Sequence, residues 1–222
     1  GMRNIMWKLA LDTGQVLDVT RQVARIKGDQ LYSVPCLAST PVVLEGHVLL
    51  REMGSRGNRG DTKHVVYIDK KTGEIDEKIY AGHVDYRAGY APFAASEKYL
   101  IVPFGVQDIE RAPPVCQPFN RIVCKDVATG EQLWDFNVGP TFAEPVLEED
   151  RIFIGTRAGY LYCLKADGEY WSASSERIAW EFKAEGGINR GMEIDKQHVY
   201  VGSNDGLVYC LDKADGKLVW SY

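Results

Sequence analysis

The chain has 222 residues, of which 45% are hydrophobic and 26% are charged, a composition typical of a globular protein with a sizeable core. Its formal net charge is −5, with 31 acidic against 26 basic residues, so it lacks the basic surplus that a general nucleic-acid binder needs. No stretch approaches the roughly eighteen consecutive apolar residues of a membrane helix, and we expect no membrane span.

Residues 4–20, "NIMWKLALDTGQVLDVT", contain two short β-rich runs on either side of a Thr-Gly turn. This pattern predicts a β-hairpin. It is only half of the unit that recurs further along the chain.

Four longer units follow, and each of them contains four short β-rich runs separated by turns. They cover roughly residues 41–80, 91–136, 145–182 and 192–222. Each unit closes on a turn that ends in glycine, at Gly73, Gly130, Gly168 and Gly216. Four-stranded units repeated every roughly 40 to 50 residues predict an all-β fold, a β-propeller of antiparallel blades. We expect four full blades and a partial fifth in a single domain or fragment, as an open or incomplete ring.

Two long loops interrupt these units. The segment 51–64, "REMGSRGNRGDTKH", is rich in glycine and charge, which favours a solvated loop and leaves an anion-binding loop as the alternative. The segment 104–121 contains several prolines and is expected to be a second inserted loop.

The closing turns carry a family resemblance. The segments "CKDVATGEQLW" (124–134) and "CLDKADGKLVW" (210–220) resemble the repeat A-x-D-x-x-x-G-K-x-x-W of pyrroloquinoline-quinone-like (quinoprotein alcohol dehydrogenase-like) β-propellers. The tryptophan slots hold Trp134, Trp180 and Trp220, whereas Glu77 occupies the slot of the first full unit. Such a tryptophan is expected to lie between adjacent blades and to donate its indole N–H to a backbone carbonyl.

The resemblance also raises the question of a quinone cofactor. In the quinone-dependent enzymes, the cofactor lies over a tryptophan and next to adjacent cysteines, with a calcium ion held by Glu, Asn and Asp. This chain has neither a Cys-Cys pair nor a clear calcium trio, and its five cysteines show no metal-ligand spacing. We expect no cofactor, no metal site and no catalytic residue. The sequence leaves open whether Cys36 and Cys116 form a disulfide.

Ligands of propellers usually bind in the central funnel, next to the loops that lead into each innermost strand. Aligning these loops brings together Ser39, Thr40, Thr141 and the ligand-binding candidates His83, Asp85, Arg87, Tyr90, Glu144, Asn189 and Arg190. Two arginines and a carboxylate could hold an anion or a peptide carboxylate. The alternative is that these are ordinary solvated loop residues.

The leading hypothesis is a non-enzymatic interaction or scaffold module that binds a protein or peptide, with self-association through an open edge. One alternative is a fragment of a quinone-dependent oxidoreductase. Another is a carbohydrate-associated binding or lyase propeller, in which Tyr86, Tyr90, Tyr170 and Trp171 would stack on sugars. The resemblance favours a periplasmic or extracellular location, and the lack of a recognisable signal sequence leaves a cytoplasmic one open.

Overall fold

The computed structural model describes residues 5–9, 16–21, 26–27, 30–31, 36–37, 40–53, 64–80, 92–104, 119–168 and 175–222. Within these ranges the regular structure is β-strand, apart from one turn of 3-10 helix at Ser175–Arg177. No helix in the described residues has the length and hydropathy needed to cross a membrane. The prediction of an all-β fold is confirmed.

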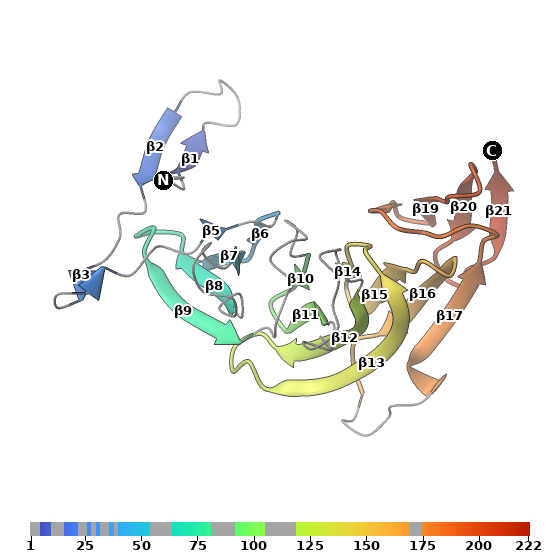
Figure 1. Ribbon diagram of the computed structural model, residues 1–222, viewed down its shortest axis with the longest axis horizontal. Helices are drawn as coiled ribbons and strands as arrows, with labels where there is room; N and C mark the ends of the chain where they lie inside the picture. The colour runs from blue at the N-terminus through green and yellow to red at the C-terminus, as the bar shows by residue number, and fades with distance from the viewer. Residues whose placement is uncertain are drawn as a thin grey trace.

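Four antiparallel sheets, named blades 1 to 4 below, make up most of the structure (Figure 1). Blade 1 consists of β6 (Val42–Val43), β7 (His47–Met53), β8 (His64–Asp69) and β9 (Ile75–Tyr80), with β5 (Cys36–Leu37) also paired to β7. Blade 2 consists of β10 (Ala94–Ala95), β11 (Tyr99–Phe104), β12 (Phe119–Asp126) and β13 (Gln132–Thr141). Blade 3 consists of β14 (Val146–Glu148), β15 (Arg151–Gly155), β16 (Tyr160–Lys165) and β17 (Ile178–Lys183). Blade 4 consists of β18 (Glu193–Ile194), β19 (His198–Gly202), β20 (Val208–Asp212) and β21 (Leu218–Ser221).

The predicted N-terminal hairpin is formed by β1 (Ile5–Leu9) and β2 (Val16–Arg21), which pair antiparallel. A second, shorter pair consists of β3 (Ile26–Lys27) and β4 (Gln30–Leu31). In the described part of the chain these two pairs form separate two-stranded sheets.

The four blades follow one another along an arc (Figure 1). The short first strands β6, β10 and β14 lie on its concave side, and β10 contacts β14. The last strands β9, β13, β17 and β21 lie on its outer side. Each blade therefore runs outward from a common centre, as in a propeller.

The hydrophobic core lies between the blades. Leu49, Tyr67 and Ile79 of blade 1 pack with Leu100 and Val102 of blade 2, and similar clusters join blades 2 and 3 and blades 3 and 4. Because each blade buries its faces mainly on its neighbours, the arrangement of the blades decides which side chains are covered.

The closing turns have the conformation expected from their glycines. The φ angles are +71° at Gly73, +71° at Gly130, +109° at Gly168 and +73° at Gly216. This left-handed region favours glycine. In blade 2 the Asp126 carboxylate accepts the backbone N–H groups of Ala128 and Thr129 at 2.9 and 2.8 Å, which holds the turn.

One prediction about the loops needs correction. Arg51, placed by its sequence in the basic loop, lies in β7 and is fully buried, with its Nη1 donating to the carbonyl oxygen of Pro92 at 3.1 Å. Burial lowers the Arg51 pKa to about 9. Residues 54–63 of this segment, and 105–118 of the second loop, lie outside the described residues.

Candidate functional site

The tryptophan slots form the contacts between blades. Trp134 is 2% exposed, and its Nε1 donates to the carbonyl oxygen of Ala166 in blade 3 at 2.8 Å. Trp180 is 7% exposed, and its Nε1 donates to the carbonyl oxygen of Lys213 in blade 4 at 3.0 Å. Each acceptor stands three residues after the cysteine that lies opposite the tryptophan slot of its own blade, Cys163 or Cys210, so one contact joins successive blades in the same way.

Blade 1 makes the equivalent contact with a different residue. Glu77 stands in the tryptophan slot opposite Tyr67 of β8. The Tyr67 hydroxyl donates to the carbonyl oxygen of Val127 at 2.8 Å, and Val127 occupies the turn position of Ala166 and Lys213. The hydrogen bond between blades is thus kept, while its donor has moved to the neighbouring strand.

A second contact missed by sequence reasoning covers Trp134. The guanidinium carbon of Arg177 lies 4.1 Å from the centre of the Trp134 ring. Its Nη1 donates to the carbonyl oxygens of Lys165 and Asp167, both at 2.8 Å. Arg177 follows the insertion after Gly168, and it stacks on the tryptophan as cations commonly do on aromatic rings.

Trp220 differs from the other two tryptophans because 45% of its surface is exposed. It lies opposite Cys210, as Trp180 lies opposite Cys163, so its place within the blade is the same. Its position in the repeat therefore does not explain its exposure. What differs is the contact with a following blade, which Trp134 and Trp180 make.

A cavity of about 550 Å³ lies at the innermost strands. All four blades contribute to its lining: Thr40, Val42, Phe93, Ala94, Ala95, Glu144, Pro145, Val146, Leu147, Gly191, Met192 and Glu193. Apolar side chains make up much of the wall, and two carboxylates provide negative charge. We call this space the axial cavity.

The structure brings some of the predicted funnel residues to the axial cavity. Glu144 and Thr40 line it, and Asn189 and Arg190 directly precede its lining residue Gly191. The Asn189 side-chain oxygen is buried and accepts no hydrogen bond from the described residues. Thr141 is buried instead, and its hydroxyl donates to the carbonyl oxygen of Gly155 at 2.6 Å.

The remaining predicted ligand residues lie outside the described residues. They are Ser39, His83, Asp85, Arg87, Tyr90 and the sugar-stacking candidates Tyr86, Tyr170 and Trp171.

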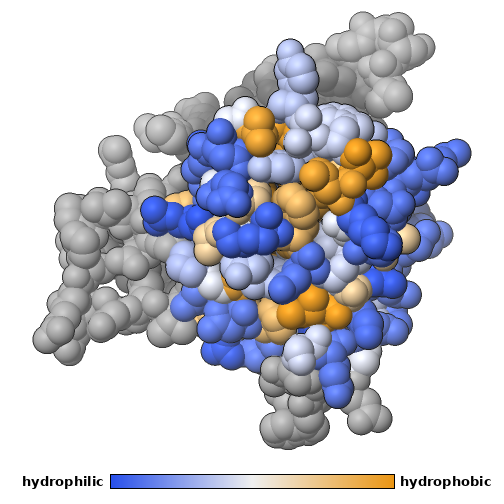
Figure 2. Space-filling model, turned by 90° about the vertical axis from the view of Figure 1, so that its right-hand side faces the viewer, coloured by the Kyte–Doolittle hydropathy of each residue, from blue (hydrophilic) through white to orange (hydrophobic). Residues whose placement is uncertain are grey.

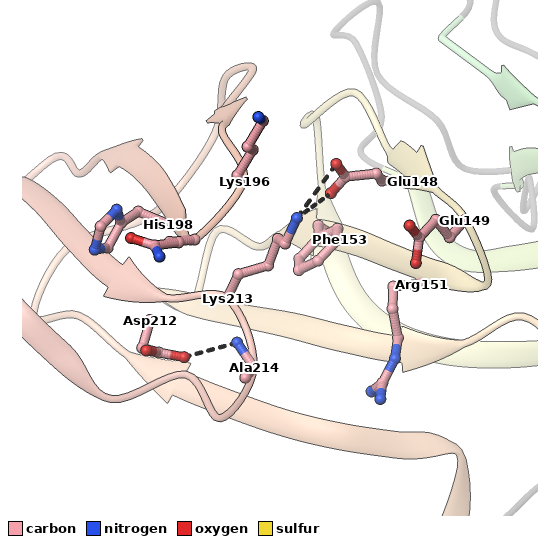
Figure 3. A pocket seen from close by; sticks show the side chains of 10 residues that line it. Glu148, Glu149, Arg151, Phe153, Lys196, His198, Asp212, Lys213 and Ala214 are labelled. Atoms are coloured by element: carbon pink, nitrogen blue, oxygen red, sulfur yellow. Dashed lines mark hydrogen bonds and ion pairs between the residues drawn. The ribbon is translucent and has the colours of Figure 1, made fainter.

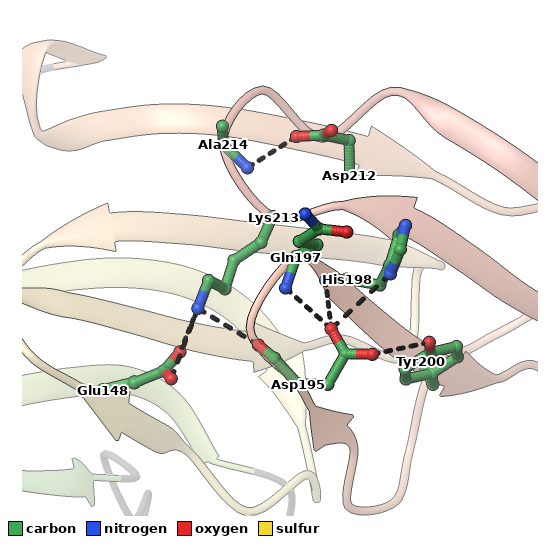
Figure 4. A network of polar contacts seen from close by, with 8 residues as sticks. All are labelled: Glu148, Asp195, Gln197, His198, Tyr200, Asp212, Lys213 and Ala214. Carbon is green, nitrogen blue, oxygen red and sulfur yellow. Dashed lines mark hydrogen bonds and ion pairs between the residues drawn. The ribbon is translucent and has the colours of Figure 1, made fainter.

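A second hollow, of about 490 Å³, lies between blades 3 and 4 (Figure 3). Lys213 points across it, and its Nζ lies 3.2 Å from the Glu148 carboxylate. The same Nζ donates to the carbonyl oxygen of Asp195 at 3.1 Å (Figure 4). Since the Lys213 backbone also accepts from Trp180, this residue ties blade 4 to blade 3 through both its backbone and its side chain.

Asp195 is the centre of a polar network beside this hollow (Figure 4). Its Oδ1 accepts the backbone N–H groups of Gln197 and His198, both at 2.7 Å, and its Oδ2 accepts the Tyr200 hydroxyl at 2.9 Å. These hydrogen bonds lower the Asp195 pKa to about 2, and they raise the Tyr200 pKa to about 12. The network holds this turn in place, and the Asp195 carboxylate stays charged.

Three buried cysteines are poorly suited to cofactor or nucleophile chemistry. Cys124, Cys163 and Cys210 are buried in three different blades. Burial raises the pKa of Cys124 to about 12 and that of Cys163 to about 11, so both thiols stay protonated near neutral pH. Within the described ranges no three His, Cys, Asp or Glu side chains form a metal-binding group. These residues do not fit the quinone and calcium of the enzymes that carry this type of repeat.

Sequence comparison identifies the type of repeat. The family model described as outer membrane protein assembly factor BamB matches residues 118–222. BamB of Escherichia coli (strain K12) is 34% identical over 113 residues, which are 49% of this chain and 28% of that protein. Over residues 118–222 the repeats are therefore similar to the pyrroloquinoline-quinone-like repeats of BamB. BamB of Salmonella typhimurium (strain LT2) is 28% identical over 125 residues, which are 52% of this chain and 30% of that protein.

Solved structures show a likeness in fold. BamB from Moraxella catarrhalis aligns with a TM-score of 0.54 at 14% identity, over 86% of this chain and 51% of that one. Quinohemoprotein alcohol dehydrogenase from Comamonas testosteroni aligns with a TM-score of 0.56 at 16% identity, over 86% and 35%. At such low identity these likenesses show the propeller fold alone. The chain spans about 30% of the length of its curated relatives.

Proposed function

We infer that this chain is a non-enzymatic propeller module that binds an extended segment of a protein partner in the axial cavity. The observation that carries this proposal is the lining of the cavity, which all four blades contribute. A site assembled from every blade is formed only when the blades stand in their native order. It is also where propeller ligands are expected.

The chemistry of the lining indicates what kind of segment would fit. Glu144 and Glu193 supply carboxylates, while Phe93, Leu147 and Met192 supply an apolar wall. A peptide with a Lys or Arg next to an apolar side chain would satisfy both, because charge complementarity selects the partner and apolar contact adds affinity. Since the relatives are named outer membrane protein assembly factors, we propose that the partner belongs to such an assembly.

The test is an array of immobilised random peptides probed with the tagged chain. We expect selected peptides to combine a basic residue with an apolar one. The variant Glu144→Gln should weaken their binding by about 2- to 5-fold, because one partly exposed ion pair contributes about 0.4 to 1 kcal/mol. The matched control Glu131→Gln changes an exposed carboxylate on a closing turn and should leave binding unchanged.

Three results would contradict the proposal. The first is an array in which no peptide is retained above the tag alone, and the second is a Glu131→Gln variant with the same effect as Glu144→Gln. The third is clear turnover of an alcohol or a sugar after reconstitution with the quinone and calcium, which would establish an oxidoreductase.

A further inference from the structure

The sequence contains three Asp-Gly pairs, which are 167–168, 205–206 and 215–216. In such a pair the backbone nitrogen of the glycine can attack the side-chain carboxyl carbon of the aspartate. Glycine favours this reaction because it has no side chain to hinder the approach and its backbone is the least restricted. In sequence the three pairs are alike, whereas in the structure one of them differs from the other two.

Exposure to water does not distinguish the three pairs. Asp167, Asp205 and Asp215 are all exposed. Two of them belong to blade 4, and Figure 2 shows the side of the molecule on which this blade lies, where hydrophilic residues cover much of the surface. The difference between the pairs therefore lies in their hydrogen bonds.

Hydrogen bonds hold both reacting groups of the pair Asp215–Gly216. The N–H of Gly216 donates to the carbonyl oxygen of Asp212 at 2.9 Å. The Asp215 carboxylate accepts the backbone N–H of Lys217 at 3.0 Å and also forms an ion pair with the Lys217 side chain. These contacts have to break before the nitrogen can reach the carboxyl carbon.

The pair Asp205–Gly206 is held in a similar way. The N–H of Gly206 donates to the carbonyl oxygen of Ser203 at 3.1 Å. The Asp205 carboxylate accepts the Tyr209 hydroxyl at 2.9 Å and the backbone N–H of Leu207 at 3.0 Å. This pair is therefore also restrained at its nitrogen and at its carboxylate.

The pair Asp167–Gly168 in blade 3 lacks these restraints. Within the residues that the structure describes, the Gly168 N–H donates no hydrogen bond and the Asp167 carboxylate accepts none. Arg177 explains the difference at the nitrogen. The carbonyl of Lys165 corresponds to that of Asp212 in blade 4, but it accepts the Arg177 Nη1 at 2.8 Å instead of a glycine N–H.

We propose that Asp167 isomerises to isoaspartate in the folded chain, and that it does so faster than Asp205 and Asp215. The Gly168 nitrogen attacks the Asp167 side-chain carboxyl carbon and loses its proton; a C–N bond forms, and one carboxyl oxygen leaves as water. Water then adds to one of the two carbonyls of the resulting succinimide and opens the ring, which gives either aspartate or isoaspartate. One water leaves and one returns, so the reaction needs no other reactant.

The product is compatible with the turn in which it forms. Ring opening toward isoaspartate moves the peptide bond onto the Asp167 side chain and turns the former backbone carbonyl into a carboxylate. This carbonyl already accepts the Arg177 Nη1 at 2.8 Å, and a carboxylate is a stronger acceptor for a guanidinium. The Ala166 carbonyl, which accepts from Trp134, precedes the site. The contact between blades 2 and 3 should therefore persist while the modified residue accumulates.

The test follows the three pairs in one sample. The folded chain is kept at neutral pH and physiological temperature for several weeks in water enriched in oxygen-18. Each ring opening adds one labelled oxygen, and peptide mass spectrometry measures the label in each Asp-Gly peptide. We expect label to enter Asp167 at least about 10-fold faster than Asp205 or Asp215, because hydrogen bonds restrain the latter two. Chromatography of the same peptides should show isoaspartate at residue 167.

Two controls separate the effect of the fold from that of the sequence. In urea the three pairs should take up label at similar rates, because the hydrogen bonds of the folded chain are then absent. The variant Asp167→Glu keeps a carboxylate but would have to form a larger ring, so it should take up no label at this position. Its circular dichroism spectrum should match that of the wild-type chain.

Four results would overturn the proposal. They are a folded chain without label above background at Asp167, equal labelling of the three pairs, faster labelling of Asp205 or Asp215, and label at Asp167 without isoaspartate in the same peptide. None of these measurements involves the axial cavity, so their outcome is independent of peptide binding.

Discussion

At the scale of single residues, Gly216 serves two purposes in the closing turn of blade 4. Its φ of +73° lies in the left-handed region, and a Cβ built there would lie 2.5 Å from Cε3 of Trp180. The missing side chain therefore permits both the turn and the close approach of the tryptophan from blade 3. Gly206 has a φ of +92° but no atom within 4 Å of such a Cβ. A substitution at Gly206 therefore tests the cost of the left-handed backbone conformation alone.

We predict that Gly206→Ala lowers the free energy of unfolding by about 1 to 2 kcal/mol through backbone strain. Gly216→Ala should lower it by a further 1 to 3 kcal/mol or so, because the methyl group collides with the Trp180 ring. Urea unfolding followed by circular dichroism measures both values. An equal loss in the free energy of unfolding for the two variants would show that the collision of the methyl group with Trp180 does not destabilise the chain.

Asp195 predicts a pH dependence of stability. Its pKa is about 2 in the folded chain, owing first to the backbone N–H groups of Gln197 and His198, against about 3.9 for an unfolded aspartate. The charged carboxylate therefore favours the folded state above about pH 4, and this contribution disappears as the pH falls from 4 toward 2.

The variant Asp195→Asn should accordingly show a lower urea midpoint than the wild-type chain at pH 7. The difference between the two midpoints should narrow as the pH is lowered from about 4 toward 2. Urea midpoints of both proteins, measured across this pH range, test the prediction. A difference between the midpoints that stays constant would show that the carboxylate charge does not stabilise the turn.

At the scale of elements, the contact from one blade to the next depends on a hydrogen-bond donor rather than on a particular residue type. Trp134, Trp180 and Tyr67 all donate to the same turn position of the following blade. The tyrosine comes from the third strand of its blade, and the tryptophans come from the fourth.

Replacing Tyr67 by Phe should therefore destabilise the chain by about 1 to 3 kcal/mol, because the Val127 carbonyl loses this hydrogen bond. Tyr162→Phe, at a half-buried ring that packs against Phe136, should change stability by less than about 0.5 kcal/mol. Thermal unfolding measures the stability of the two variants relative to the wild-type chain. A Tyr67→Phe variant as stable as Tyr162→Phe would rule out this contact as an inter-blade link.

Sequence reasoning found part of the candidate site and missed another part. The sequence singles out Glu144, which lines the axial cavity, because its loop aligns with the loops that lead into the other innermost strands, and that alignment reflects a local repeat. Tyr67 and Arg177 were missed because their partners, Val127 and Trp134, are distant in sequence and belong to neighbouring blades. A hint was available for Tyr67, since it faces the slot that lacks a tryptophan.

At the scale of the whole molecule, the position of a blade decides how much of its surface is covered by neighbouring blades. Cys124, Cys163 and Cys210 lie at matching positions opposite the tryptophan slots of blades 2, 3 and 4. Blades 2 and 3 are covered on both faces by neighbouring blades, whereas the tryptophan of blade 4 is partly exposed.

We predict that a thiol alkylating agent modifies Cys210 at least about 10-fold faster than Cys163, because blade 4 needs less free energy to open locally. Peptide mass spectrometry gives the alkylation rate of each cysteine. In denaturant all three cysteines should react alike. Equal rates in the folded chain would show that the molecule opens as one unit.

By itself the sequence determined the strands, the closing turns and the repeat of four-stranded units. These depend on neighbours in sequence: glycine permits a positive φ, an aspartate accepts turn N–H groups, and β-branched and aromatic runs favour strands. Only the tertiary structure decided which equivalent residues are buried. Trp180 and Trp220 occupy the same slot, yet one is 7% exposed and the other 45%, because burial depends on which blade stands beside them.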